Sequence, residues 1–315
     1  MNFAVWLPLL VPLFAVPLAR RGAEQLPPRT AAWALTALAL VLALSSTAAL
    51  ALLTLAGALR VPFIAALGHL SPILLGSASP ATVPTGALAA LALAGLGGLV
   101  LRRTVRHLRE LRCAQRQFKD SARAGDLSVR DDERPDAYAL PGRPGRIVVT
   151  TGMLRALSAR EREVLFAHER AHLAGRHHLF LAATEFAVAL HPALRGLRAP
   201  LSYALERWAD ESAARATGDR ALTARAVGRA ALAARAVGPR PLLSLTATAG
   251  PVPRRVTALL HAPKPAPRPL PRALACLLLA CVAVSSAGAL DAAKDLHSGI
   301  EVAQGENGPL TEHGE

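Results

Sequence analysis

The sequence is short of charged residues, of cysteine and of lysine, and each shortage bears on the class of protein. Charged residues make up 18% of the 315 positions and hydrophobic residues 52%, whereas an ordinary soluble domain is roughly 25% charged. This balance indicates a membrane protein with a soluble part and excludes disorder along the whole chain. The cysteines do not suggest a disulfide scaffold or a thiolate zinc site, because two of the three lie in one apolar run. They are Cys113, Cys276 and Cys281.

The positive charge is almost entirely arginine, and the net charge at pH 7 is +14. Strong basic charge can indicate nucleic-acid binding. Here the arginines flank long apolar runs, where basic residues fix the orientation of membrane helices and face anionic lipid. We therefore expect a lipid bilayer as a partner and no direct binding of nucleic acid. The few lysines are Lys119, Lys264 and Lys294.

Four apolar runs approach or exceed the roughly 20 residues that cross a bilayer core. They cover residues 3–19, 31–59, 82–101 and 272–290. The first run differs from a signal peptide because its arginines follow the apolar stretch instead of preceding it, so we expect a retained anchor. The shorter, proline-interrupted apolar segment 61–76 is expected to be interfacial or re-entrant.

The distribution of arginine around these runs predicts one topology. Arginines gather between the first two runs, after the third and before the fourth, and loops rich in arginine stay in the cytoplasm. We therefore expect a multi-pass protein of a bacterial cell membrane with both termini outside. The predicted parts are a membrane region at 1–101, a cytosolic domain at 102–271, a fourth span at 272–290 and a disordered acidic tail at 291–315.

The cytosolic segment is predicted to be a small domain of mixed structure. A basic helix is expected over 102–123, and short strands at 137–140 and 146–150 flank a Gly/Pro turn, which is typical of a hairpin. Ser158 and Glu161 fit a capping box, which starts a helix. The predicted fold class is mainly α, a multi-pass helical membrane protein with a cytosolic α+β domain.

The helix after the capping box carries the motif His168-Glu169-Arg-Ala-His172. Histidines four residues apart lie on one face of a helix, so both imidazoles can reach one metal ion. Glu169 lies beside them, where it can take a proton from a metal-activated water and pass it to the leaving amine of a peptide. The same pattern also arises by chance, so a third ligand is needed to support a zinc site.

A catalytic zinc takes three protein ligands and keeps one position open. Glu206 and Asp210 lie four residues apart on one predicted helix face, so Glu206 could bind the metal while Asp210 accepts the free N–H of a ligating histidine. A solvated helix face is the alternative interpretation of this pair. His177 and His178 are interpreted as surface groups or as partners of the ligands. Other downstream candidates for the third ligand are Glu185, His191 and Glu211.

The segments AHERAHLAGRHH and ALERWADESAA resemble membrane-embedded gluzincin metallopeptidases, which share the pattern HExxH…ExxxD. The chain most resembles the BlaR/MecR-type antirepressor family and is also similar to the HtpX and CAAX-prenyl endopeptidase group. The resemblance implies a zincin-like metallopeptidase domain with one zinc ion per chain, held by His168, His172 and Glu206. It further implies that Glu169 is catalytic and that Asp210 supports a ligating histidine.

The resemblance favours an integral membrane zinc endopeptidase used in regulated proteolysis, with a protein substrate such as a winged-helix transcriptional repressor. Residues 291–315 are too few for the extracellular penicillin-binding sensor domain of the antirepressors, so sensing of β-lactams is not expected. A quality-control protease of the HtpX type is the alternative enzyme, and a non-catalytic membrane receptor or scaffold is the alternative class. A site-2 intramembrane protease is set aside, because the motif helix is rich in charge and no LDG sequence follows. The oxyanion-stabilising residue is unassigned, with His261 and Arg254 as candidates.

Overall fold

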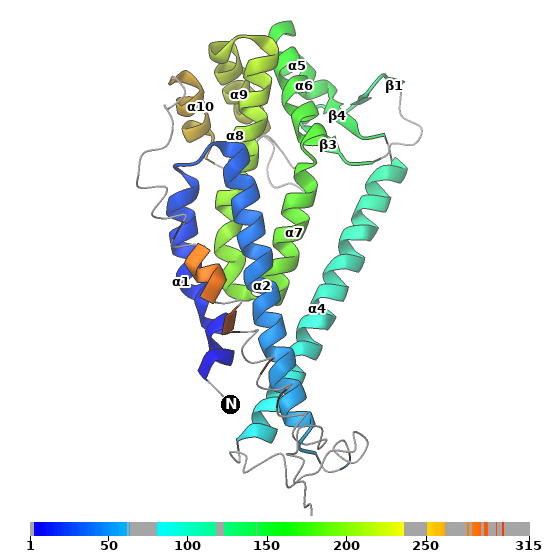
Figure 1. Ribbon diagram of the computed structural model, residues 1–315. Coiled ribbons are helices and arrows are strands. Elements are labelled where there is room, and N and C mark those ends of the chain that lie inside the picture. Colours follow the sequence, from blue (N-terminus) through cyan, green and yellow to red (C-terminus); the bar gives the residue numbers. More distant parts are fainter. Residues whose placement is uncertain are drawn as a thin grey trace, which may run out of the picture.

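The computed structural model describes most of the chain as a mainly helical molecule with one small sheet (Figure 1). This agrees with the predicted mainly α class. The predicted fourth span 272–290 and the apolar segment 61–76 lie largely outside the described residues, and so does the acidic tail 291–315. These three segments stay predictions. The described residues are 3–61, 63, 81–117, 123–142, 144–235 and 251–261, with isolated positions and short pieces between 276 and 298.

Two helices, α2 (Pro28–Ala58) and α4 (Thr82–Gln117), contain stretches long and apolar enough to cross a membrane. They match the second and third predicted runs. The first predicted run forms a short turn η1 (Phe3–Trp6) and helix α1 (Leu7–Ala23), which packs against α2. Length and composition support membrane association, while the number of passes and their direction stay predictions.

Helices α2 and α4 cross where two glycines meet. A Cβ atom on Gly57 would lie 2.7 Å from the Cα atom of Gly86, and the reverse distance would be 2.6 Å. Such a close approach of two backbones requires residues without a side chain on both helices. From this crossing α4 continues past Leu101 into the basic stretch. The predicted third span and most of the predicted basic helix 102–123 are therefore one element. The helix ends at Gln117, and Arg123, the predicted last residue of that helix, begins strand β1 instead.

A helical hairpin runs back along α1 and α2. It consists of α7 (His177–Leu190), the 3-10 turn η2 (Pro192–Leu197) and α8 (Arg198–Thr217). Trp33 of α2 packs edge-on against Phe180 of α7, with ring centroids 4.8 Å apart. The hairpin shares one hydrophobic core with α1 and α2, although it lies inside the predicted cytosolic segment, whose boundaries stay a prediction. Buried members of this core include Ala15, Val16, Leu35, Leu42, Val188, Leu197, Leu201 and Leu205.

The sheet has four short strands in the order β1-β2-β4-β3. Strands β3 and β4 pair in antiparallel register, with Ala139 opposite Ile147, which confirms the predicted hairpin. Strand β2 pairs with β4 in parallel, a pairing that the sequence analysis did not predict. Because β3 is the last strand in the order, it forms one edge of the described sheet. The strands are β1 (Arg123–Ala124), β2 (Leu127–Arg130), β3 (Ala137–Leu140) and β4 (Arg146–Thr150).

The HExxH motif lies in α6 (Ala159–Ala174), which begins with the predicted capping box between Ser158 and Glu161. A capping box satisfies backbone N–H groups that have no partner within the helix, so the start of α6 is fixed by local sequence. The helix packs against α8, α9 and strand β3. The remaining helices are α5 (Thr151–Ala156), α9 (Arg220–Arg235) and α10 (Val252–Leu260).

Candidate metal centre

Helices α6 and α8 bring three metal-binding side chains together in the interior. The Nε2 atoms of His168 and His172 lie 3.1 Å apart. The carboxylate of Glu206 lies 3.6 Å from the first of these nitrogens and 3.5 Å from the second. One donor atom from each residue lies within 4.8 Å of the other two, and all three residues are buried. This His/His/Glu cluster has the donor types and spacing that one zinc ion requires.

Each histidine of the cluster has a polar neighbour at its second ring nitrogen. Nδ1 of His168 lies 3.1 Å from Oδ1 of Asp210, a close but poorly aligned contact. Nδ1 of His172 lies 2.8 Å from Nδ1 of His177. These contacts leave both Nε2 atoms directed toward Glu206. Partners of this kind orient metal-binding histidines, so the structure places Asp210 and His177 where they can do so.

His177 itself lies against an aromatic ring. The rings of His177 and Trp208 have centroids 4.6 Å apart, and the guanidinium of Arg29 lies 5.4 Å from the centroid of the Trp208 ring. Arg29 belongs to the first turn of α2, so the beginning of this long apolar helix lies beside the cluster. His178, the other histidine of the pair, is only partly buried.

Burial and the nearby carboxylates shift the pKa values of the two cluster histidines in opposite directions. Burial disfavours protonation of His168, but the carboxylates of Asp210 and Glu206 outweigh it and raise its pKa to about 10. Burial lowers the pKa of His172 to about 3, with Glu206 acting against that effect. Burial would also raise the pKa of Glu206, but the charge of Arg255 and the contact with His168 lower it. A metal ion at this cluster would therefore compete with a proton on His168.

Glu169 is fully buried beside the cluster. Neither of its carboxylate oxygens has a hydrogen-bond partner among the described residues. Burial raises the pKa of Glu169 to about 7, with a smaller opposite effect from His168. The backbone of Ala139 on strand β3 acts in the same direction as His168. A carboxylate whose pKa lies near 7 can both accept and return a proton at neutral pH.

Arg255 of α10 completes the site and was not found by the sequence analysis. Its side chain is fully buried, and its guanidinium forms a two-pronged ion pair with Asp210, with contacts of 2.8 and 2.6 Å. A third contact of 2.8 Å reaches Oε2 of Glu206. Its position in the sequence could have indicated a buried role. Arg255 shares one helix face with Val252 and Leu259, and an arginine is unexpected on such an apolar face.

The charges of the site fit a divalent cation. Within this buried part of the described chain, three carboxylates face the single guanidinium of Arg255. Buried charges require opposite charges nearby, and a divalent cation on neutral histidines would balance the two remaining negative charges. The carboxylates are those of Glu169, Glu206 and Asp210.

The other candidate ligands lie elsewhere. Glu185 pairs with Arg198 and Arg103, and Glu211 pairs with Arg207 and Arg220. The ring of His191 lies against the backbone of α1. The two candidates for the oxyanion also make other contacts, since Arg254 pairs with Glu24 and His261 bonds to the carbonyl of Thr257.

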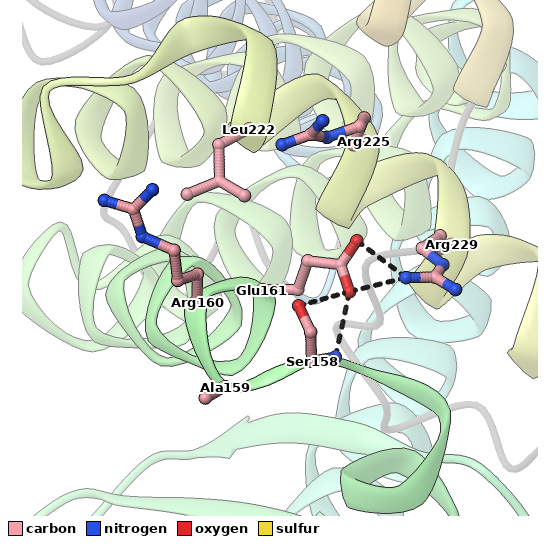
Figure 2. Close-up of a pocket in the computed structure, with 7 residues that line it drawn as sticks. All are labelled: Ser158, Ala159, Arg160, Glu161, Leu222, Arg225 and Arg229. Atoms are coloured by element: carbon pink, nitrogen blue, oxygen red, sulfur yellow. Dashed lines mark hydrogen bonds and ion pairs between the residues drawn. The ribbon is translucent and has the colours of Figure 1, made fainter.

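A pocket of about 560 Å³ lies at the other end of α6 (Figure 2). Figure 2 shows Glu161 at its centre, bonded to Ser158 and Arg229, with Arg160 and Arg225 around it. No residue of the His/His/Glu cluster lines this pocket. The buried carboxylate of Glu161 is already paired with Ser158 and Arg229. The pocket therefore surrounds the capped start of α6 and is not part of the candidate metal centre.

Comparison with known proteins gives one match. The family model described as Peptidase family M48 matches residues 107–194. This range contains the HExxH helix and ends before α8, which carries Glu206. No curated protein and no solved structure matches the chain. Over the matched segment the chain is similar to the M48 zinc metallopeptidases, and this similarity, together with the buried His/His/Glu cluster, supports a metallopeptidase.

Proposed function

We propose that the chain is a zinc-dependent endopeptidase whose one zinc ion is held by His168, His172 and Glu206. The observation that carries the proposal is the convergence of these three donors beside the buried, unpaired Glu169. A zinc ion bound there would supply a Lewis acid that polarises a peptide carbonyl and makes water a better nucleophile. Asp210 and His177 contact the Nδ1 atoms of the two imidazoles, which would leave both Nε2 atoms free to hold the ion.

Glu169 acts as the general base and then as the general acid. It takes a proton from the attacking water and delivers that proton to the nitrogen of the departing amine, so the carboxylate is regenerated. Its pKa of about 7 suits both transfers. Arg255 has a different role, since its guanidinium is occupied by Asp210 and Glu206. It neutralises these carboxylates and keeps them ionised in the protein interior.

The edge strand β3 offers a place for the substrate backbone. It forms one edge of the described sheet, it packs against α6, and Ala139 lies beside Glu169. An extended peptide can add to such an edge as a further strand. This arrangement would present a peptide bond to the cluster through main-chain contacts, with little demand on substrate sequence.

Two substrates are candidates. A cytosolic transcriptional repressor is the first, on the basis of the resemblance to the antirepressor family. Membrane proteins cleaved for quality control are the second, and the packing of α7 and α8 on the apolar helices α1 and α2 favours them. Both candidates require the same chemistry at His168, Glu169, His172 and Glu206.

The test compares newly formed protein N-termini in cells that carry the wild-type chain or the Glu169→Gln variant. Glu163→Gln is the matched control, because Glu163 is an exposed residue on the same helix. We expect N-termini that are present with the wild type and the control and absent with Glu169→Gln. Loss of a few cytosolic cleavages, above all in a DNA-binding repressor, supports the first candidate, and loss of fragments from many membrane proteins supports the second. Identical N-termini in all three strains and no zinc in the purified protein would favour a receptor or scaffold.

A further inference from the structure

Three elements meet at a charged cluster that we call the arginine belt, made of Arg103, Glu185 and Arg198. Glu185 of α7 pairs with Arg198 at the start of α8, at 2.6 Å, and with Arg103 of α4, at 3.4 Å. The three side chains are between 40% and 49% exposed. The belt therefore marks a level at which the α7–α8 hairpin and α4 lie side by side.

On one side of the belt, α4 is apolar over the thickness of a bilayer core. Residues 82–101 include no charged side chain, and at 1.5 Å per residue they extend about 30 Å. Arg102 and Arg103 follow at once, so the belt lies where the apolar surface ends. Large apolar side chains on this surface are exposed, namely Leu88, Leu91, Leu99 and Leu101.

Helix α2, counted from its crossing with α4, reaches a similar level. It crosses α4 at Gly57, and about 30 Å farther along the helix, by its rise per residue, lies Leu38. Trp33 is five residues beyond Leu38 and is 58% exposed, as expected of a tryptophan at a membrane interface. Trp33 contacts Phe180, which precedes Glu185 of the belt by five residues. Both helices therefore put the edge of the hydrocarbon core at the belt.

The His/His/Glu cluster lies close to this level. Glu206 follows Arg198 by eight residues within the same helix α8, which corresponds to about 12 Å along the helix axis. Trp208, two residues after Glu206 on α8, contacts Arg29 at the beginning of α2. The cluster therefore lies level with the first turn of this apolar helix. The candidate metal centre therefore lies only about 12 Å along α8 from the level at which the apolar surface of α4 ends.

The tip of the hairpin extends past the belt toward the apolar region. Nε2 of His191 lies 3.2 Å from the backbone oxygen of Leu9, and Gly196 approaches the side chain of Val16. Arg195 on the tip is exposed, and a long arginine side chain can reach from there to the headgroups. These contacts attach the hairpin to α1, so the level of Glu206 follows that of the apolar helices.

We propose that this site cleaves juxtamembrane segments, meaning chain that has just left the bilayer on the arginine-rich side of a membrane-anchored substrate. The proposal rests on the endopeptidase function proposed above and names its substrate class. An extended chain rises about 3.3 Å per residue, so a bond four or more residues from the end of a span can reach a site about 12 Å away. Bonds farther along the chain reach it less often, because effective concentration falls roughly as the −3/2 power of linker length.

The experiment uses proteoliposomes that contain the full chain, zinc and a single-span probe protein. In the probe, an unstructured casein segment follows the span, and cleavage sites are mapped by mass spectrometry. Two further probes insert a flexible Gly/Ser linker, so that the same casein bonds lie about 6, 15 or 30 residues from the span. We expect cleavage of a given bond to fall about tenfold between the nearest and the farthest position. Equal cleavage at all three distances overturns the proposal.

The free casein segment separates this proposal from the proposed function. If the wild type cleaves the free segment and Glu169→Gln does not, the endopeptidase function holds whatever the tethered probes show. If neither protein cleaves the free or tethered segment, the endopeptidase function fails and the juxtamembrane proposal fails with it. Dissolving the proteoliposomes in detergent should remove most of the tenfold preference, because the probe and the enzyme then no longer share a surface.

A depth measurement tests the position of the belt without any activity. Single spin labels are introduced by Leu91→Cys, Leu101→Cys and Arg170→Cys after replacement of the native cysteines, and all three positions are exposed. We expect the label at 91 to lie about 15 Å deeper than the label at 101, from the rise of the helix, and the label at 170 to lie in water. A label at 101 that lies in water or near the bilayer centre overturns the placement of the site.

Discussion

Two buried glutamates on helix α6 have opposite environments. Glu161, in the first turn, is 3% exposed, and Glu169, two turns later, is 0% exposed. Glu161 accepts hydrogen bonds from the backbone and side chain of Ser158 and pairs with Arg229. Glu169 has no such partner among the described residues.

The difference in partners reverses the effect of burial on the pKa. Burial would raise the pKa of Glu161, but its bonds to Ser158 and its pairing with Arg229 hold it below the ordinary value of 4.5. Burial dominates at Glu169 and raises its pKa to about 7. Partners thus keep one glutamate charged at neutral pH as a helix cap and leave the other available for proton transfer. Unsatisfied buried polar groups of this kind are uncommon and point to function.

The largest expected effect separates the two glutamates by activity. Glu169→Gln should lower the turnover number on a peptide substrate by about 10²- to 10⁴-fold, the contribution of a positioned acid–base group. Glu161→Gln should leave the turnover number of the folded protein nearly unchanged. Steady-state kinetics on both zinc-loaded variants, purified in detergent, makes the comparison. An active Glu169→Gln enzyme would contradict the assignment of the base.

The next effect concerns the guanidinium that balances the buried carboxylates. Arg255→Met should destabilise the protein by about 3–5 kcal/mol, because it leaves Asp210 and Glu206 without their buried partner. The neighbouring variant Arg254→Met removes an ion pair that is more than half-exposed on both sides, and should cost at most about 1 kcal/mol. Thermal unfolding of the two variants in detergent measures the difference. Equal destabilisation would show that the ion pairs of Arg255 add little.

A smaller effect tests the partner of a cluster histidine. Asp210→Asn should weaken zinc binding by about 10- to 100-fold, because the contact with His168 sets the basicity and orientation of that imidazole. Glu211→Gln is the control, since Glu211 is the next residue of α8 but pairs only with Arg207 and Arg220 among its described contacts. Zinc competition with a fluorescent chelator measures both affinities. Equal affinities in the two variants would exclude a role for Asp210 in metal binding.

Much of α6 and the hairpin was predictable because local sequence decides both. The capping box at Ser158 and Glu161 and the spacing of His168 and His172 are patterns within a single helix. The strands at 137–140 and 146–150 are likewise joined by one short turn. The structure has all of these elements at the expected positions.

The missed features depend on contacts between distant segments. Arg255 lies 45 residues after Asp210 and meets it only when α10 packs on α8. Strand β2 has four residues and pairs in parallel with β4, a pairing that no local turn dictates. By composition alone, the apolar helix α7 fits a domain core as well as a membrane surface. Its packing on α2 was therefore not predictable from the sequence.

The smallest expected effect uses pH to compare the two glutamates again. The folded pKa of Glu161 lies below its ordinary value of 4.5, so its charge contributes stability above pH 4.5 that is lost as the pH falls through the folded pKa. Glu161→Gln should therefore be less stable than the wild type by about 1 kcal/mol at pH 7, the usual value of a helix cap, and the gap should close in acid. Unfolding at a series of pH values measures this gap, with the exposed Glu163→Gln variant as the control.

In the zinc-free protein, Glu169 should have the opposite effect on the pH dependence of stability. Its folded pKa is raised to about 7, so the folded state holds a proton that the unfolded state releases, and the wild type loses stability as the pH rises from about 4.5 to 7. Glu169→Gln should therefore gain stability relative to the wild type over that range. The deficit of Glu161→Gln, by contrast, should already be complete at pH 4.5 and stay constant up to pH 7. Gaps of the same sign for the two variants would show that the two carboxylates differ less than their partners indicate.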